Sequence, residues 1–235
     1  MADYQEYFMR VQGNGEYLKK VPLEFCDHHM CLTAVANYGS ALRDVPETLL
    51  DRELCLAAVK NYGNALRYVP ENLRDYELCH VAVEQDGATL HLVPESLRKR
   101  ELCLTAVQNK GWVLEYVPEE LRDREMCLAA VRNRGGALEF VPEGLRDREM
   151  CQIAVQKGNG ALQYVPEDLR DREMCLMAVQ HDGSALEFVP EGLRDREICV
   201  AAMKNNDLLA LYHVPDAIRG EFLAQEDDEA SRPSM

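Results

Sequence analysis

The sequence predicts an all-α protein, an α-solenoid in which 24-residue helical repeats form a superhelical stack. Three observations support this fold class. A Val-Pro dipeptide recurs eight times at a constant spacing of 24 residues. The residues between these dipeptides keep the same order of apolar, acidic and small side chains. No segment alternates apolar and polar residues with the period of two that half-buried β-strands show. Because one such unit is too short to bury its own apolar face, neighbouring units must cover one another.

The Val-Pro dipeptides divide the 235-residue chain into repeats. We expect eight complete repeats over residues 21–213, with partial capping repeats at 1–20 and 214–223. Residues 224–235 are polar and acidic, so we expect a disordered tail there. The dipeptides begin at Val21, Val45, Val69, Val93, Val117, Val141, Val165 and Val189, and a ninth begins at Val214 after a step of 25.

Each repeat is expected to contain three helical pieces, in the order that residues 117–140 illustrate. A first short helix should cover 118–122, because proline suits the first turn of a helix. A longer helix should follow from Asp123, whose carboxylate can accept an orphan N–H of the first turn. This helix should end at Gly135, where we expect the left-handed conformation that glycine tolerates. A last short turn at 137–140 leads to the next Val-Pro.

The predicted core consists of apolar residues that occupy fixed positions in the repeats. In the same unit these are Leu121, Ala130, Val131, Leu138 and Phe140. Stacking places equivalent residues of adjacent layers roughly 8–10 Å apart, the usual separation of packed helices.

Eight of the nine cysteines share one position of the repeat. A disulfide requires Cα atoms within about 7 Å and Zn–S bonds are about 2.3 Å, so one cysteine per layer forms neither. We expect buried free thiols, which are typical of a reducing compartment and favour a cytoplasmic location. The eight are Cys31, Cys55, Cys79, Cys103, Cys127, Cys151, Cys175 and Cys199.

The repeat unit reads Val-Pro-Glu-x-Leu-Arg-Asp-Arg-Glu-x-Cys-x-x-Ala-Val-x-x-x-Gly-x-Ala-Leu over roughly residues 10–220. It resembles an uncharacterised family of tandem helical repeats, a domain of unknown function in bacterial and protist proteins, whose domains look like two such units each. The resemblance implies a helical fold and a bacterial effector or adaptor, delivered into a host cell, but no activity. The chain is more weakly similar to the leucine-rich variant repeats, which pair an α-helix with a short 3₁₀ helix.

The charge, the distribution of apolar residues and the absence of known motifs argue against several functional classes. The formal net charge is −15, which repels phosphate backbones and disfavours nucleic-acid binding. Residues 1–10 lack the apolar run of a secretory signal, and no stretch approaches the roughly 18 apolar residues of a membrane span. Phosphate-binding glycine loops, HExxH and G-x-S-x-G are absent from the sequence, so we expect neither an enzyme nor a cofactor.

Candidate binding residues lie where the repeats differ from one another. One position changes from basic to acidic along the chain, through Arg43, Arg67, His91, Glu115 and Glu139. A second position holds the tyrosines Tyr38 and Tyr62. The only tryptophan, Trp112, occupies a position that is small in other repeats, so it is either an aromatic anchor for a partner or packs against a neighbouring unit.

The recurring Arg-Asp-Arg-Glu motif allows two interpretations. Repeated arginines can bind phosphate or carboxylate groups of a ligand. Alternatively the aspartate caps the helix and the arginines pair with glutamates of the same or an adjacent layer. We favour this structural interpretation, because the motif contains its own opposite charges.

One cluster departs from the repeat pattern, at Cys26-Asp-His-His-Met-Cys31 in the first complete unit. Cysteine and histidine can bind Zn²⁺, and a Cys–His pair can form a nucleophile. The candidate metal ligands are Cys26, His28 and His29, although their spacing matches no standard zinc pattern. The competing interpretation is simple divergence of a terminal repeat.

The sequence therefore favours a non-catalytic protein–protein interaction scaffold or adaptor, monomeric, that binds an extended protein partner along its repeats. One alternative is a nucleic-acid reader with one base per repeat, which the acidic charge opposes. The other is a metal-binding protein that uses the Cys26-His28-His29-Cys31 cluster.

Overall fold

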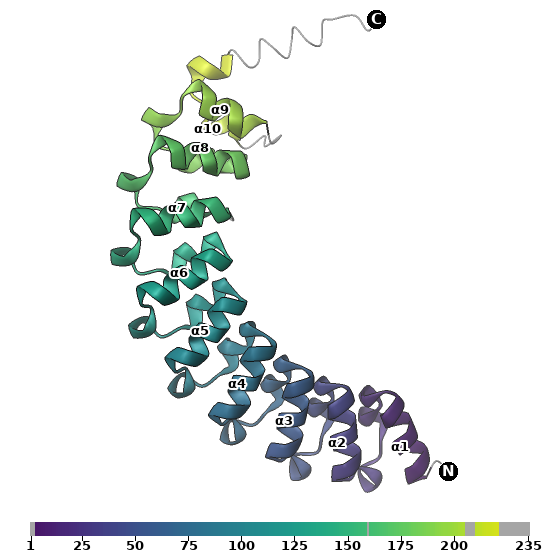
Figure 1. The fold of residues 1–235 in the computed structure, drawn as a ribbon. Helices are drawn as coiled ribbons and strands as arrows, with labels where there is room; N and C mark the ends of the chain where they lie inside the picture. Colours follow the sequence, from purple (N-terminus) through teal and green to yellow (C-terminus); the bar gives the residue numbers. More distant parts are fainter. Residues whose placement is uncertain (1–2, 159, 205–209, 221–235) are drawn as a thin grey trace, which may run out of the picture. The chain divides into compact units, whose positions relative to one another are not determined.

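A computed structural model describes residues 3–158, 160–204 and 210–220. The chain divides into two compact units, within residues 1–122 and 123–235, and each is described by itself. The predicted tail at 224–235 lies outside the described residues, as do residues 221–223 of the last partial repeat. The residue bounds of the helices follow for each unit (Figure 1).

The first unit contains α-helices that each pack against the next one along the chain. These are α1 (Tyr4–Gly13), α2 (His28–Asn37), α3 (Arg52–Asn61), α4 (Tyr76–Gln85) and α5 (Arg100–Asn109). Two 3₁₀ helices follow each of them: η1 (Gly15–Lys20), η2 (Leu23–Phe25), η3 (Gly39–Asp44), η4 (Glu47–Leu49), η5 (Gly63–Tyr68), η6 (Glu71–Leu73), η7 (Gly87–Leu92), η8 (Glu95–Leu97), η9 (Gly111–Tyr116) and η10 (Glu119–Leu121).

The second unit repeats this arrangement. Its α-helices are α6 (Arg124–Asn133), α7 (Arg148–Lys157), α8 (Arg172–His181), α9 (Arg196–Met203) and α10 (Ala210–His213). Its 3₁₀ helices are η11 (Gly135–Phe140), η12 (Glu143–Leu145), η13 (Ala161–Tyr164), η14 (Glu167–Leu169), η15 (Gly183–Phe188) and η16 (Glu191–Leu193). Within each unit, the predicted α-solenoid class is confirmed: all-α repeats, 24 residues apart, that pack sequentially.

The helix starts agree with the prediction. Asp123 is the N-cap of α6, and its carboxylate accepts the Met126 N–H at 2.8 Å. Aspartates at the equivalent position cap α2, α3, α4, α7, α8 and α9 in the same way. The exception is α5, where Lys99 occupies the N-cap position and makes no side-chain cap.

The expected role of the repeat glycine is wrong. Gly135 is the first residue of η11, and the residue that caps α6 is Arg134 in an extended conformation, φ −147°. A Cβ atom at Gly135 would lie 2.1 Å from the Ala154 carbonyl oxygen of the next helix. The glycine is therefore required by close packing between repeats, not by backbone conformation. Among the described glycines, Gly158 and Gly160 are the ones with positive φ.

The core lies between successive repeats. Ala130, Val131 and Leu138 are buried as predicted, whereas Leu121 and Phe140 are only partly buried. The eight cysteines that share one repeat position are also buried and free. Burial raises the pKa of Cys55, Cys79, Cys103, Cys151 and Cys175 to about 11.

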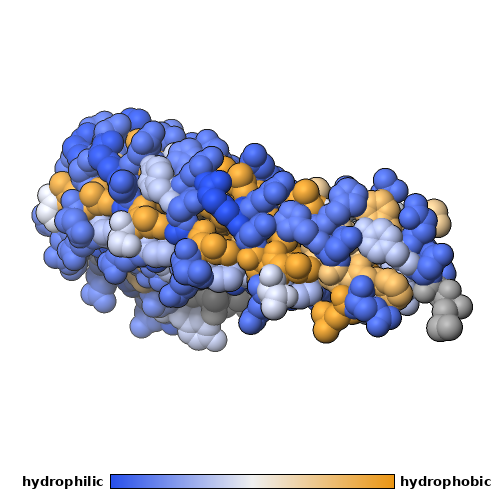
Figure 2. Space-filling model, turned by 90° about the horizontal axis from the view of Figure 1, so that it is seen from below, coloured by the Kyte–Doolittle hydropathy of each residue, from blue (hydrophilic) through white to orange (hydrophobic). Residues whose placement is uncertain are grey.

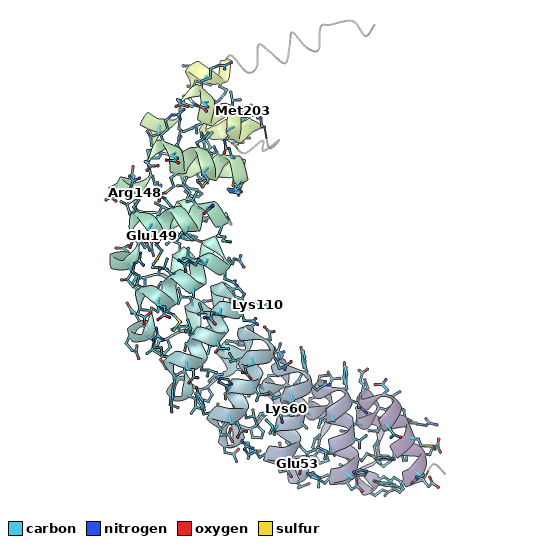
Figure 3. The ribbon with its side chains drawn as sticks, in the orientation of Figure 1. Glu53, Lys60, Lys110, Arg148, Glu149 and Met203 are labelled. Carbon is cyan, nitrogen blue, oxygen red and sulfur yellow. The ribbon has the colours of Figure 1, made fainter. Side chains whose placement is uncertain are left out.

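The α-helices of a unit run in the same sense, so their starts and ends form two different edges. Glu53 near the start of α3 and Lys110 after the end of α5 mark these edges in the first unit (Figure 3). Figure 2 shows one face on which hydrophobic residues form patches separated by hydrophilic ones. None of the helices among the described residues has the length and apolar character of a membrane span.

Candidate binding surface

The first arginine of the Arg-Asp-Arg-Glu motif binds backbone carbonyl groups. Arg98 donates from Nε to the Val93 oxygen at 2.9 Å and from Nη1 to the Tyr116 oxygen at 2.8 Å, the first and last residues of its own repeat. The expectation that this arginine pairs with glutamate is wrong, because its guanidinium lies against two carbonyls. Equivalent bonds are made by Arg74, Arg146, Arg170 and Arg194.

The second arginine of the motif pairs with acidic residues of the next repeat. Arg52, in the equivalent position, contacts Asp75 at 2.6 Å and Glu77 at 2.5 Å. The same bridge joins Arg124 to Asp147 and Glu149, Arg172 to Asp195 and Glu197, and Arg148 to Asp171. The structural interpretation of the motif is thus supported: the first arginine binds carbonyl groups within its own repeat, and the second arginine joins its repeat to the next.

An open hollow of about 490 Å³ lies between two consecutive repeats of the first unit. We name it the tyrosine groove, and its lining residues are Tyr38, Gly39, Ser40, Arg43, Asn61, Tyr62 and Tyr68. Tyr38 and Tyr62 follow the last residues of α2 and α3, where the extended cap conformation turns the chain into the next 3₁₀ helix. The structure therefore brings together three of the predicted binding residues, Tyr38, Arg43 and Tyr62.

The tyrosine rings of the groove are accessible to a ligand. Tyr38 and Tyr62 are 42% and 46% exposed. Asn61 has a structural role, because its side chain accepts the Gly39 N–H at 2.7 Å and donates to the Ala36 oxygen at 3.0 Å. Apart from Asn61, the polar side chains that line the groove are the three tyrosines, Ser40 and Arg43.

That guanidinium belongs to Arg43, on η3. Its Nε atom lies 3.3 Å from the Asp44 carboxylate, and its Nη2 atom lies 3.7 Å from Glu16. Hydrogen bonding to Asp44, and to a smaller extent to the Tyr68 hydroxyl, raises the pKa of Arg43. Its side chain is 41% exposed, so it remains a charged donor at the edge of the groove.

The other predicted binding residues lie elsewhere. Arg67 is exposed and donates to the Asn64 side chain at 3.2 Å. Trp112 is half-buried and packs edge-on against Tyr116 of its own 3₁₀ helix, with ring centroids 6.0 Å apart. Glu115 is exposed on the same helix.

Glu139 belongs to the second unit, on η11. Burial and a hydrogen bond to Glu139 raise the pKa of Tyr164 in the following repeat. Glu139 is therefore close to Tyr164 of the next repeat and far from the tyrosine groove in sequence.

Ser40 and Tyr68 line the groove but were not predicted as binding residues. Tyr68 shares a repeat position with Tyr116, Phe140, Tyr164 and Phe188, which resembles a core position in the sequence. The sequence nevertheless contained a hint of this role. Tyr68 directly follows Arg67, which occupies the repeat position whose charge varies along the chain.

The unusual cluster of the first complete repeat separates into three sets of contacts. The Cys26 and Cys31 sulfur atoms lie 3.4 Å apart. His28 Nε2 lies 2.8 Å from the Asp51 carboxylate, and the His29 ring stacks on Phe8 at 5.0 Å. The structure therefore does not bring Cys26, His28 and His29 together as one ligand set.

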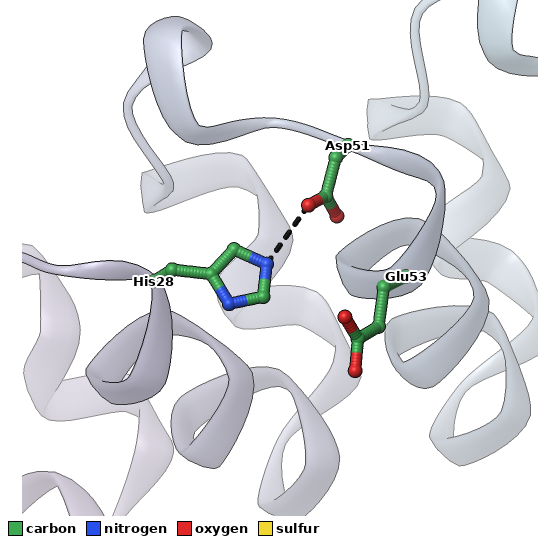
Figure 4. A group of neighbouring side chains, drawn as sticks. All are labelled: His28, Asp51 and Glu53. Atoms are coloured by element: carbon green, nitrogen blue, oxygen red, sulfur yellow. Dashed lines mark hydrogen bonds and ion pairs between the residues drawn. The ribbon is translucent and has the colours of Figure 1, made fainter.

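His28 instead faces two carboxylates of the next repeat, Asp51 and Glu53 (Figure 4). One ligand atom from each of the three residues lies within 4.8 Å of the others. Burial acts to raise the pKa of Asp51, but hydrogen bonds from the Leu54 N–H and from His28 outweigh it, so the pKa is lowered. His28 stands where the following repeat has Arg52, which contacts both of its own acidic partners.

Comparison with protein families gives one match, to the family described as Domain of unknown function (DUF4116). The matched segments are 27–74, 51–98, 75–122, 99–146, 123–170 and 171–219. Each segment spans about two repeats and begins at the N-cap position of an α-helix. No curated protein and no solved structure matches the chain significantly. Because the matched segments cover most of the sequence, the chain belongs to the DUF4116 family.

Proposed function

We propose that this protein is a non-catalytic scaffold or adaptor that holds an extended segment of a partner protein in the tyrosine groove. The observation that supports the proposal is the convergence of Tyr38, Tyr62 and Arg43, from consecutive repeats, on one hollow. Tyrosine and arginine are enriched among the residues that dominate binding energies at protein interfaces. Tyrosine offers a large rigid surface with few rotatable bonds.

The groove favours a partner segment of defined chemistry. Equivalent side chains of neighbouring repeats are roughly 8–10 Å apart, and a segment in the extended polyproline II conformation advances roughly 3.1 Å per residue with about three residues per turn. Two partner side chains about three residues apart can therefore contact Tyr38 and Tyr62 together. A carboxylate between or beside them can accept hydrogen bonds from Arg43.

The proposal is tested by selecting binders from a displayed library of random linear peptides against the full chain. Affinities of the selected peptides are then measured by isothermal titration calorimetry. Replacing Tyr62 by alanine should weaken binding roughly 10- to 100-fold, as expected for a dominant interface residue. Tyr212, which is 79% exposed in the second unit, provides the matched control. A library that yields no binder, or binders that Tyr62→Ala and Tyr212→Ala affect equally, would contradict the proposal.

A second candidate function is cation binding by His28, Asp51 and Glu53. In three other described repeats one guanidinium bridges the equivalent carboxylates. The His28 side chain is shorter than the arginine of those repeats, and it hydrogen-bonds Asp51. The exposed Glu53 carboxylate therefore lies near a ring nitrogen of His28 and is not paired with a guanidinium from that position. Imidazole and carboxylate groups are ligands that Zn²⁺ prefers.

The direct test of this second candidate is titration of the full chain with Zn²⁺, followed by metal analysis after dialysis. His28→Arg introduces the arginine found in most other repeats and should abolish zinc binding while preserving the fold. Equal zinc retention by the wild type and His28→Arg would exclude this site.

A further inference from the structure

We propose that Cys26 and Cys31 form a redox-active dithiol that closes reversibly to an intrachain disulfide. Their sulfur atoms lie 3.4 Å apart, at the junction of η2 and α2. Cys26 is partly exposed, whereas Cys31 is buried. An oxidant can therefore reach one sulfur, and the second sulfur already lies beside the first.

The proximity of the two sulfurs follows from the geometry of the repeat. The core thiols Cys103, Cys151 and Cys199 point to the carbonyl oxygen of the residue five positions earlier, at 3.5–3.7 Å. Cys31 has the same place in its own repeat, and the residue five positions earlier is Cys26. The backbone at this position is thus adjacent to the core thiol in several described layers.

Cys26 replaces a residue with a structural role. Six other repeats have arginine there: Arg74, Arg98, Arg122, Arg146, Arg170 and Arg194. The arginines donate to backbone carbonyl groups, including that of the last residue of their own repeat. A cysteine side chain is too short for such bonds, and its sulfur remains beside Cys31.

The two thiols differ in reactivity. Cys26 is partly exposed and Cys31 is fully buried, so solvent and a dissolved oxidant reach only the first of them. The thiolate is the attacking species in disulfide exchange. The accessible Cys26 is therefore the initial nucleophile and Cys31 is the resolving thiol, while the remaining core thiols are buried.

The reaction balances with a low-molecular-weight disulfide such as oxidised glutathione. The Cys26 thiolate attacks one sulfur of that disulfide, and one glutathione thiolate leaves. Cys31 then loses its proton to solvent and attacks the Cys26 sulfur, which expels the second glutathione thiolate. The protein loses two electrons and two protons, and two molecules of reduced glutathione form.

The experiment incubates the folded full chain with a series of oxidised-to-reduced glutathione ratios. Acid quenching, alkylation of the remaining thiols and tryptic digestion follow. Residues 21–43 form one tryptic peptide, which contains Cys26 and Cys31 and no other cysteine. The expected product is this peptide without alkylation and lighter by two hydrogens, while peptides with the other seven cysteines are fully alkylated.

Two variants keep the test decisive. Cys26→Arg introduces the arginine of six other repeats, and Cys26→Ala keeps a small side chain if arginine disturbs the first repeat. Both should prevent loss of the Cys31 thiol, with circular dichroism confirming that each variant is folded. Alkylation of both cysteines in the wild type at every ratio, or equal oxidation of the other core cysteines, would overturn the proposal.

Discussion

The glycine that follows each α-helix illustrates what the sequence does and does not reveal about a single residue. Its recurrence at one position correctly marks where a helix ends, but the structural reason lies in the next repeat. A Cβ atom at Gly39 would lie 2.4 Å from the Ala58 oxygen and 2.8 Å from the Tyr62 Cβ. Such a contact between residues about 20 positions apart is not visible in a local pattern.

Gly39→Ala should therefore reduce the free energy of unfolding by roughly 1–3 kcal/mol, the usual cost of overpacking. Urea unfolding followed by circular dichroism measures this change. Gly13→Ala is the matched control, because nothing lies within 4 Å of a Cβ atom there. Equal effects of the two substitutions would contradict the packing argument.

The two arginines of the charged motif should differ in their contribution to stability. Arg98→Met removes hydrogen bonds to the Val93 and Tyr116 carbonyl groups and should cost roughly 1–3 kcal/mol. Arg52→Met breaks an exposed ion pair and should cost at most about 1 kcal/mol, and less at high salt. Urea unfolding at low and high salt distinguishes them, and the reverse order would contradict the assigned roles.

Among the helical elements, the α-helices were predictable because Asp123 and its equivalents provide an N-cap signal in the sequence. The short helix predicted over 118–122 is the 3₁₀ helix Glu119–Leu121, and the final turn is a longer 3₁₀ helix from Gly135 to Phe140. Proline fixes the position of the first piece, but nothing local in the sequence distinguishes one short helical form from another.

One helix start shows a paired exception. Lys99 replaces the capping aspartate of α5, and its ammonium group lies 5.1 Å from the ring centroid of Tyr76. Tyr76 in turn stands where Arg52 lies in the preceding repeat. A cation–π contact thus takes the place of the Arg–Asp bridge between these repeats.

Restoring the repeat residues here should stabilise the protein. Lys99→Asp alone gains an N-cap, worth about 1 kcal/mol, but loses a cation–π contact of about 0.5–1 kcal/mol, so the net change should be small. The stability gained by the double variant Tyr76→Arg/Lys99→Asp should exceed the sum of the stability changes of the two single variants. Thermal unfolding of the wild type, the two single variants and the double variant gives the coupling energy between positions 76 and 99. Strictly additive effects would contradict the interaction between these two residues.

The capping aspartates also predict a dependence of stability on pH. Backbone N–H groups, followed by arginine, lower the pKa of Asp147, Asp171 and Asp195, and Arg52 is the largest influence that lowers the pKa of Asp75. A pKa that is lowered on folding stabilises the protein fully above the unfolded value, near 3.9, and this stabilisation disappears as the pH falls through the folded pKa.

The melting temperature should therefore change little between about pH 7 and 5 and decrease below about pH 4. Asp75→Asn is a useful comparison, because asparagine also caps helices but has no carboxylate to titrate. The difference in melting temperature between the wild type and Asp75→Asn should shrink on acidification. A difference that grows at low pH would contradict the sign of the shift.

At the scale of the whole molecule, the repeat architecture was fully accessible from the sequence, because its period is constant. The candidate site was accessible only in part. Comparison of the repeats identified Tyr38, Arg43 and Tyr62 as variable, but it could not show that they line one hollow while Trp112 packs on Tyr116. Sequence differences between repeats indicate which positions are exposed. Which of these exposed residues lie side by side depends on how successive repeats stack on one another.

The central claim, that the tyrosine groove binds a partner segment, is tested most directly by hydrogen–deuterium exchange. The full chain is measured with and without a peptide selected from the displayed library. We predict slower backbone exchange confined to residues 36–44 and 60–68, and no such change when the peptide is added to Tyr62→Ala at the same concentration. Protection centred on other repeats, or equal protection in Tyr62→Ala, would contradict the account.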